Sequence, residues 1–301
     1  MAKLRPQFVL FGDSITQLSF ENGGWGAALA ALYARQADVI LRGYRGYNTS
    51  WALLILDKIF PELSSPPDVV TVFFGANDAA LPVPDGEHFH VPLPQYKANL
   101  HQIVSHIKSN SETTVVVLIT PPPLDDDAWI EFRRANYNKQ PEALPDRINE
   151  VTKLYAQACK EVAKEACVPV IDLWSVFQQT QNWCQAYLID GLHLSVGGNR
   201  IVVDELVNVL NDILFLRADK LPMDFPPFGD IDPKNPGVAF QSWKNNANPV
   251  DVIVKTHQFA SRHSGHKQAK IIFLWLADQA LASSTRRIPT MVLPINVIAE
   301  S

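Results

Sequence analysis

Five short apolar runs, each separated from the next by a stretch with helical periodicity, constrain the fold of this chain most. The runs FVLF, ADVILRG, DVVTVFFG, TTVVVLIT and VPVIDL occupy residues 8–11, 37–43, 68–75, 113–120 and 168–173. They are largely apolar rather than alternating, which is typical of strands covered on both faces. Helical patterns lie near residues 24–36, 49–60, 95–109, 146–166 and 197–214. This order predicts an α/β fold with three layers, in which helices cover both faces of a five-stranded parallel sheet.

Cap residues precede two of the predicted helices. Asn48 and Thr49 stand before the second pattern, and Pro145 and Asp146 stand before the fourth. Short polar side chains at such positions accept hydrogen bonds from the first free N–H groups of a helix. The local signals therefore agree with the overall alternation.

One connection, residues 121–145, is unusually long for a compact domain. Loops of this length are more often functional than idle, so we expect this one to form a wall of a substrate cleft. The three aspartates at 125–127 within it are interpreted as a solvated run.

The alternation of strand and helix patterns ends near residue 216, which predicts one α/β domain over residues 1–216. Residues 217–243 are rich in proline and are expected to lie extended on the surface. Residues 244–301 carry seven Lys and Arg against three Asp and Glu, whereas the whole chain has a net charge of −5. We predict that these residues are an atypical, disordered C-terminal tail that lies outside the working fold.

The composition excludes several classes of protein. No block of basic residues accompanies the net charge of −5, so a nucleic-acid partner is not expected. No apolar run reaches the length of a membrane span, and no secretory leader is recognised, so the predicted location is cytoplasmic. The three cysteines lack metal-ligand spacing, and the pair of histidines in HFH at 88–90 lacks a third ligand, so no metal or cofactor is predicted.

The stretch FGDSIT ends the first apolar run in Ser14. A serine at the carboxyl end of a parallel strand lies where α/β proteins place their chemistry. Such a hydroxyl attacks an ester only if a base removes its proton. The stretch LIDGLHLS supplies Asp190 and His193, three residues apart in a glycine-containing turn, so the carboxylate can fold back onto the imidazole and orient it toward Ser14.

Two further strand ends supply hydrogen-bond donors. Gly46 lies in RGYRGYNTS after the second run, and Asn77 lies in FFGANDA after the third. A glycine leaves its backbone N–H open to a ligand, and an asparagine carries a side-chain amide. Taken singly, Ser14 could be a helix cap, Gly46 a turn residue and Asn77 part of an Asx turn. Taken together, they favour one catalytic crevice.

The chain resembles the GDSL, or SGNH, hydrolase family over roughly residues 5–240. The family's four blocks match FGDSIT, GYRGYNT, GAND and DGLH in the same order and with similar spacing. Within the family, FGDSITQLSFENGGWG, VFFGANDA and LITPPP are most similar to the isoamyl acetate-hydrolysing esterases and their plant relatives. The resemblance implies a flavodoxin-like SGNH fold, and the absence of G-x-S-x-G argues against the α/β-hydrolase fold.

The same resemblance implies a role for each motif residue. Ser14 would be the nucleophile, His193 the general base and acid, and Asp190 the group that orients it. The N–H groups of Ser14 and Gly46 and the side chain of Asn77 would form the oxyanion hole.

The expected activity is hydrolysis of small carboxylic esters of the acetyl type, without a cofactor. Three related activities stay open: carbohydrate acetylesterase, lysophospholipase and thioesterase. A non-catalytic scaffold, inactivated by the unusual tail, is the alternative from another class. Trp51, Phe74 and Leu81 flank the motifs and are interpreted either as lining of an acyl pocket or as core residues.

Overall fold

A single parallel sheet forms the centre of the computed structural model, which describes residues 5–60, 65–137, 145–213 and 216–243. The described part contains five strands, in the spatial order β2-β1-β3-β4-β5: β1 (Gln7–Gly12), β2 (Asp38–Gly43), β3 (Val69–Phe73), β4 (Val115–Ile119) and β5 (Val170–Ile171). Every pair of neighbours is parallel. The predicted fold class is confirmed, although β5 is shorter than the apolar run that predicted it.

The strand order creates a crossover point beside β1. The chain runs from β1 to the edge strand β2 and then returns to β3 on the other side of β1. The loops after β1 and β3 therefore leave in different directions, and ligands bind at such points in open α/β sheets. Gly12 is paired with both Gly43 and Phe73, so the loops after these three strands begin at the same level.

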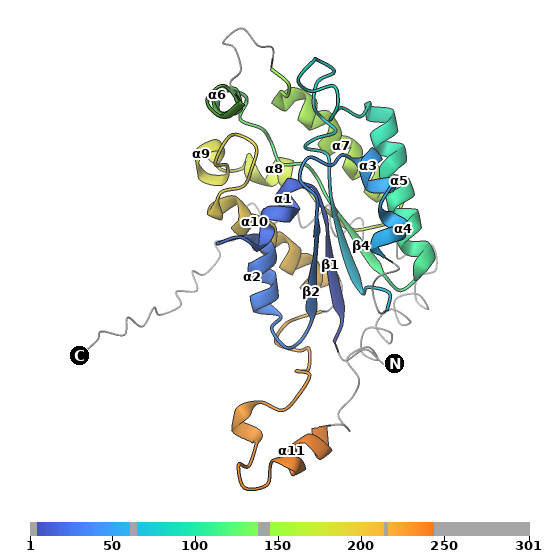
Figure 1. Cartoon of the computed structure of the whole chain (residues 1–301), viewed down its shortest axis with the longest axis vertical. Helices are drawn as coiled ribbons and strands as arrows, with labels where there is room; N and C mark the ends of the chain where they lie inside the picture. Colours follow the sequence, from blue (N-terminus) through green and yellow to red (C-terminus); the bar gives the residue numbers. More distant parts are fainter. Residues whose placement is uncertain (1–4, 61–64, 138–144, 214–215, 244–301) are drawn as a thin grey trace, which may run out of the picture. The chain divides into compact units, whose positions relative to one another are not determined.

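Helices cover both faces of the sheet, as Figure 1 shows. Phe8 and Leu10 of β1 point into one apolar core, and the alternating Val9 and Phe11 point into the other. The first core is covered by α2 (Trp25–Leu32), α8 (Leu173–Phe177) and α10 (Val196–Asn208). The second core is covered by α3 (Thr49–Leu53), α4 (Leu56–Ile59), α5 (Leu93–Asn110) and α7 (Asn149–Glu165).

The remaining helical segments lie in the connections and after α10. They are α1 (Ser14–Gln17), η1 (Leu18–Phe20), α6 (Asp126–Tyr137), α9 (Trp183–Tyr187), η2 (Val209–Ile213), η3 (Phe228–Asp230) and α11 (Pro236–Trp243). Side-chain caps start several helices of the described chain. Asp13 accepts from the N–H of Ile15 at the start of α1, and Asn48, Asp172 and Ser195 do the same for α3, α8 and α10. The expected cap at Asn48 is thus confirmed.

Two predicted helices differ in length from the sequence pattern. The pattern over 24–36 ends as a helix at Leu32, and Arg35 then takes a positive φ of 65° as the chain turns into β2. The pattern over 49–60 is divided between α3 and α4, with Leu54 and Ile55 at the break. The buried positions Ala52 and Leu56 still face the same core, so the break does not change which face is apolar.

The long connection after β4 is not a plain loop, because it contains α6. The interpretation of its aspartates as a solvated run is wrong for two of the three. Asp125 accepts a hydrogen bond of 3.2 Å from the N–H of Ala128, and Asp126 accepts one of 2.7 Å from the N–H of Asn149. These bonds start α6 and tie it to α7.

Residues 216–243 contact the sheet domain through polar groups. Arg35 forms an ion pair of 3.2 Å with Asp224, and Tyr33 donates a 2.7 Å hydrogen bond to the carbonyl of Leu216. The predicted tail, residues 244–301, lies outside the described residues. None of the helices in the described ranges has the length and apolar character that crossing a bilayer requires.

Candidate active site

Ser14 lies at the first turn after β1, on the carboxyl edge of the sheet. Gly12 permits this tight turn, since a Cβ there would lie 2.1 Å from Thr16 Oγ1 and 2.5 Å from the carbonyl oxygen of Phe73. The Ser14 side chain is largely buried, and its Oγ lies 3.0 Å from Nε2 of His193. The structure thus brings together two residues from opposite ends of the domain.

The turn that carries His193 is held by one carboxylate. Asp190 Oδ1 accepts hydrogen bonds from the N–H groups of Leu192 at 2.9 Å and His193 at 2.7 Å. Its Oδ2 lies 2.7 Å from His193 Nδ1. Gly191 takes a φ of 90°, which lets the chain turn back this sharply. All three residues suggested by the sequence therefore form one hydrogen-bonded row, Ser14 to His193 to Asp190.

The charge of Asp190 determines which imidazole nitrogen carries a proton. Burial by itself would raise the pKa of Asp190, but the hydrogen bonds and charge of His193, with the Leu192 N–H, together hold that pKa below its usual value. An ionised carboxylate only accepts, so His193 Nδ1 must donate to it. Nε2 of a neutral ring is then free to accept the proton of Ser14.

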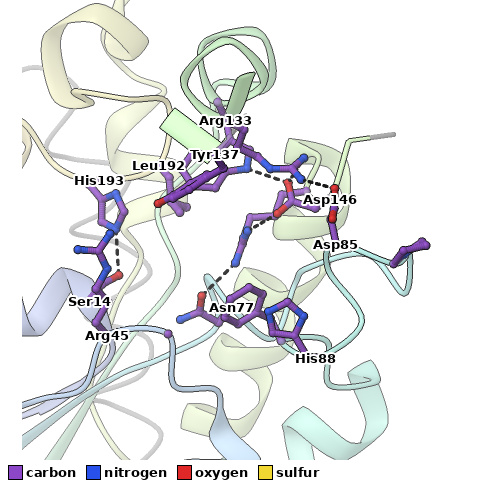
Figure 2. A pocket seen from close by; sticks show the side chains of 15 residues that line it. Ser14, Arg45, Asn77, Asp85, His88, Arg133, Tyr137, Asp146, Leu192 and His193 are labelled. Atoms are coloured by element: carbon purple, nitrogen blue, oxygen red, sulfur yellow. Dashed lines mark hydrogen bonds and ion pairs between the residues drawn. The ribbon is translucent and has the colours of Figure 1, made fainter. Parts of the chain in front are cut away.

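Gly46 and Asn77 line the same cavity as Ser14 and His193, which has a volume of about 560 Å³. Gly46 has a φ of 79°, a left-handed conformation that glycine adopts readily. Asn77 Nδ2 donates one hydrogen bond, of 2.9 Å, to the carbonyl of Tyr47. Figure 2 shows Asn77 across the cavity from Ser14 and His193. Within residues 5–60, 65–137, 145–213 and 216–243, the N–H groups of Ser14 and Gly46 have no hydrogen-bond partner.

Two buried carboxyl groups support the loops of the site. Asp78 accepts from both the N–H and the hydroxyl of Thr49, which ties the loop after β3 to α3. Burial raises the pKa of Asp78 to about 6 despite these bonds. Burial also raises the pKa of Asp13 to about 7, against the lowering effects of the Ile15 N–H and the charge of His193.

The far wall of the cavity holds residues that the motifs did not indicate. They include a buried ionic group, Arg133, Asp146 and Arg147, together with Phe89 and Trp129. The expected helix cap at Asp146 is wrong: α7 begins three residues later, and Asp146 instead binds Arg133 at 2.9 Å and Arg147 at 2.6 Å. Residues 121–145, which were expected to form a cleft wall, supply Trp129 and Arg133 of it.

The structure also shows which other residues singled out from the sequence line the cavity. His88 and Phe89 of the HFH stretch line the cavity, whereas His90 Nδ1 lies 2.6 Å from the carbonyl of Ala80. Phe74 is a core residue, and neither Trp51 nor Leu81 lines the cavity. In the part of the chain that the structure describes, no three His, Cys, Asp or Glu side chains are grouped as metal ligands.

A second, smaller hollow adjoins His193. Its volume is about 270 Å³, and Arg45 and His193 belong to both hollows. Its apolar lining consists of Leu18, Phe132 and Ile189. The His193 side chain therefore borders both hollows.

Comparison with known proteins adds evidence on the family and the fold of the chain. The family model of GDSL-like lipases and acylhydrolases matches residues 8–206. A GDSL esterase/lipase of Arabidopsis thaliana is 48% identical over 239 residues, covering 79% of this chain and 98% of that one. The human isoamyl acetate-hydrolyzing esterase 1 homolog is 41% identical over 241 residues, covering 79% and 93%. The crystal structure of a lipase/acylhydrolase from Enterococcus faecalis has a TM-score of 0.53 at 27% identity, covering 68% and 95%.

Proposed function

Because the chain belongs to the family of GDSL-like lipases and acylhydrolases, which act on ester bonds, we propose that it hydrolyses small carboxylic esters through an acyl-enzyme. The observation that carries this proposal is the row from Ser14 Oγ to His193 to Asp190, with distances of 3.0 Å and 2.7 Å. A nucleophile, a base and a group that orients the base are what serine-dependent acyl transfer needs.

In the first half-reaction, His193 Nε2 takes the hydroxyl proton while Ser14 Oγ bonds to the ester carbonyl carbon. The carbonyl oxygen becomes an oxyanion, which the N–H groups of Ser14 and Gly46 and the Nδ2 of Asn77 stabilise. Donors aimed at a charge that develops only in the transition state are usually the largest single contribution to such catalysis. The Asp190 carboxylate stabilises the imidazolium that forms.

The intermediate then collapses. The bond between the carbonyl carbon and the alcohol oxygen breaks, and His193 gives its proton to the departing oxygen, which leaves an acyl group on Ser14. Water then hydrolyses the acyl-enzyme by the same steps. His193 removes a proton from the water molecule while the water oxygen adds to the acyl carbon. The Ser14 oxygen then leaves with the proton from His193. The products are one carboxylic acid and one alcohol.

We propose that each hollow holds one half of the ester. The carbonyl oxygen would point at Gly46 and Asn77, which line the larger cavity, and we place the acyl group in that cavity. The departing oxygen must lie near His193 Nε2, so the alcohol lies toward the smaller hollow with Leu18 and Ile189. The apolar side chains of Leu18, Phe132 and Ile189 favour short apolar alcohols. The name of the human relative, an isoamyl acetate-hydrolyzing esterase homolog, supports the same substrate class.

Initial rates on p-nitrophenyl acetate, butyrate and octanoate test this proposal. We expect the acetate or butyrate ester to be preferred, and Ser14→Ala to lower kcat by roughly 10⁴- to 10⁶-fold. Ser19→Ala is the matched control, because Ser19 is also buried and its hydroxyl has no partner among the described residues.

Each other outcome favours a different activity. Preference for octanoate would favour a lysophospholipase or thioesterase, and activity confined to acetylated sugars would favour a carbohydrate acetylesterase. Full activity in Ser14→Ala would overturn the proposal. Failure of the wild-type chain to react with a fluorophosphonate probe would favour the alternative that the protein is a non-catalytic scaffold.

A further inference from the structure

Arg147 is a buried cation in direct contact with the Asn77 side chain. It is 3% exposed, and its Nη2 donates a hydrogen bond of 3.0 Å to Asn77 Oδ1. We propose that Arg147 is a positioning residue for the hydrolysis, because its guanidinium turns the Asn77 amide so that Nδ2, and not Oδ1, is presented to the oxyanion. This inference rests on the proposed function, since Asn77 meets an oxyanion only if esters react at Ser14.

The orientation of the Asn77 amide is determined from both of its ends. A guanidinium only donates, so the atom that faces Arg147 must be the oxygen. The carbonyl of Tyr47 only accepts, so the atom that faces it, at 2.9 Å, must be the nitrogen. Nδ2 carries two hydrogens, and the bond to Tyr47 uses one of them. The second hydrogen is the donor available to the oxyanion.

Arg147 itself is fixed by contacts on several sides. Its Nε donates to the carbonyl of Ala76 at 3.2 Å, and its Nη1 donates to Asp146 at 2.6 Å. The Arg147 guanidinium carbon also lies 5.1 Å from the Phe89 ring centroid and 5.3 Å from that of Trp129. Cations are attracted to the faces of aromatic rings at such distances. The hydrogen bond to Asn77 therefore comes from a group with little freedom to move.

The Asp146 carboxylate has further partners besides Arg147. Its Oδ1 accepts from Trp129 Nε1 at 2.9 Å and lies 2.9 Å from Arg133 Nη1. Arg133 also binds Asp85 at 2.9 Å, and Figure 2 shows Arg133 between the two carboxylates. Arg133 thus provides a matched comparison: it is also a buried cation on Asp146, but it makes no hydrogen bond to Asn77 in the described structure.

Loss of Arg147 should affect the transition state more than substrate binding. Without the guanidinium, only the Tyr47 carbonyl holds the Asn77 amide, so turning Oδ1 toward the site, where it repels an oxyanion, costs less free energy. The substrate carbonyl carries no full charge before the reaction. We therefore expect a fall in kcat with KM nearly unchanged, the pattern of an interaction made in the transition state.

The experiment measures kcat and KM on p-nitrophenyl acetate for Arg147→Met and Arg147→Lys, each with Asn77 intact and in the Asn77→Ala background. Asn77→Ala alone is expected to lower kcat by about 10²- to 10³-fold, as loss of an oxyanion donor does. Arg147→Met is expected to lower kcat by roughly 10- to 100-fold with Asn77 present and by less than about twofold in its absence. Arg147→Lys should recover part of the loss, because its ammonium keeps the charge and the capacity to donate.

The comparison variant is Arg133→Met, whose fold-effect on kcat should be the same in both Asn77 backgrounds. An Arg147 effect of equal size with and without Asn77 would overturn the inference, because it would show that Arg147 acts elsewhere. If Arg147→Met does not fold, Arg147→Lys decides by the same criterion. Full activity in both Ser14→Ala and Asn77→Ala would instead overturn the proposed function, and this inference with it. Loss of activity in Ser14→Ala and Asn77→Ala, with an unchanged kcat in the Arg147 variants, would overturn only the inference about Arg147.

Discussion

The Ser14 hydroxyl lies 3.0 Å from Nε2 of His193, although 179 positions of the chain separate the two residues. The contact exists because β1 delivers Ser14 to the carboxyl edge of the sheet, while the turn before α10 delivers His193 to the same edge. Asp190 then determines which nitrogen of the imidazole faces the serine. Each of these dependencies can be tested separately.

Asp190→Asn should lower kcat/KM by about 10³- to 10⁴-fold. Asparagine keeps an oxygen to accept from the N–H groups of Leu192 and His193, so the turn is expected to survive. Its NH₂ group would face His193 Nδ1, which would leave the ring proton on Nε2, where it cannot accept from Ser14. Steady-state rates and urea unfolding check this, with Asp204→Asn as a control whose half-exposed carboxylate pairs with Arg200. A loss of stability that matches the loss of rate would contradict the argument.

Asp13→Asn should change how stability depends on pH. The pKa of Asp13 is raised by burial from 3.8 to about 7, so the folded state binds its proton more tightly than the unfolded state does. The stability that this proton contributes is fully present below about pH 4 and is lost as pH rises toward about 7. The wild-type free energy of unfolding should therefore fall relative to Asp13→Asn by on the order of a few kcal/mol over that range. Urea unfolding at a series of pH values measures the difference in unfolding free energy between the two proteins. A difference that does not change with pH would contradict the prediction.

Gly46→Ala should lower both stability and kcat. Gly46 has a φ of 79°, where a side chain costs about 1–2 kcal/mol. Space is not the cause, since the added Cβ would have only Phe89 Cε1 nearby, at 3.5 Å. Relief of the strain would tilt the N–H that we assign to the oxyanion. Gly23→Ala is the control for this strain, with a φ of 78° outside the cavity. Its added Cβ would also lie 2.9 Å from Val196 Cγ2, so it should lose at least as much stability as Gly46→Ala, without a comparable loss of kcat. Equal kcat in the two variants would argue against the role of Gly46.

Ile189→Ala should alter preference for the alcohol and not for the acyl group. Ile189 is 68% exposed and lines the smaller hollow beside His193. We expect kcat/KM for 3-methylbutyl acetate to fall about three- to tenfold, with ethyl acetate nearly unaffected. The comparison variant is Val196→Ala, because Val196 is equally exposed but lies outside both hollows. A change across acyl lengths at constant alcohol would show that the two sides have been assigned the wrong way round.

A chain that ends at Trp243 should keep its activity. Every residue that we assign to the reaction lies at or before His193, and the family model ends at residue 206. We propose that residues 244–301 are a tail outside the hydrolytic domain. Rates on p-nitrophenyl acetate for the shortened and full chains decide this. Loss of activity on shortening would show that the tail belongs to the working protein, and a large gain would show that it inhibits.

Much of the fold could be predicted because its signals are short in range. The apolar run that became β1 and the cap at Asn48 each involve residues that are neighbours in the chain. The split of one helical pattern into α3 and α4, and the presence of α6 in an expected loop, could not be predicted in the same way. Both depend on how segments pack, which periodicity within one segment does not report.

By itself, the amino-acid sequence determined the α/β class, the parallel sheet and the motif residues from Ser14 to His193, because strand periodicity and motif spacing are local properties. Only the tertiary structure decided what surrounds them. Asn77 and Arg147 are 70 positions apart, and their contact exists because the loop after β3 and the segment before α7 meet at one edge of the sheet. The direction in which an amide points depends on the partners that folding places beside it, and sequence neighbours do not specify those partners.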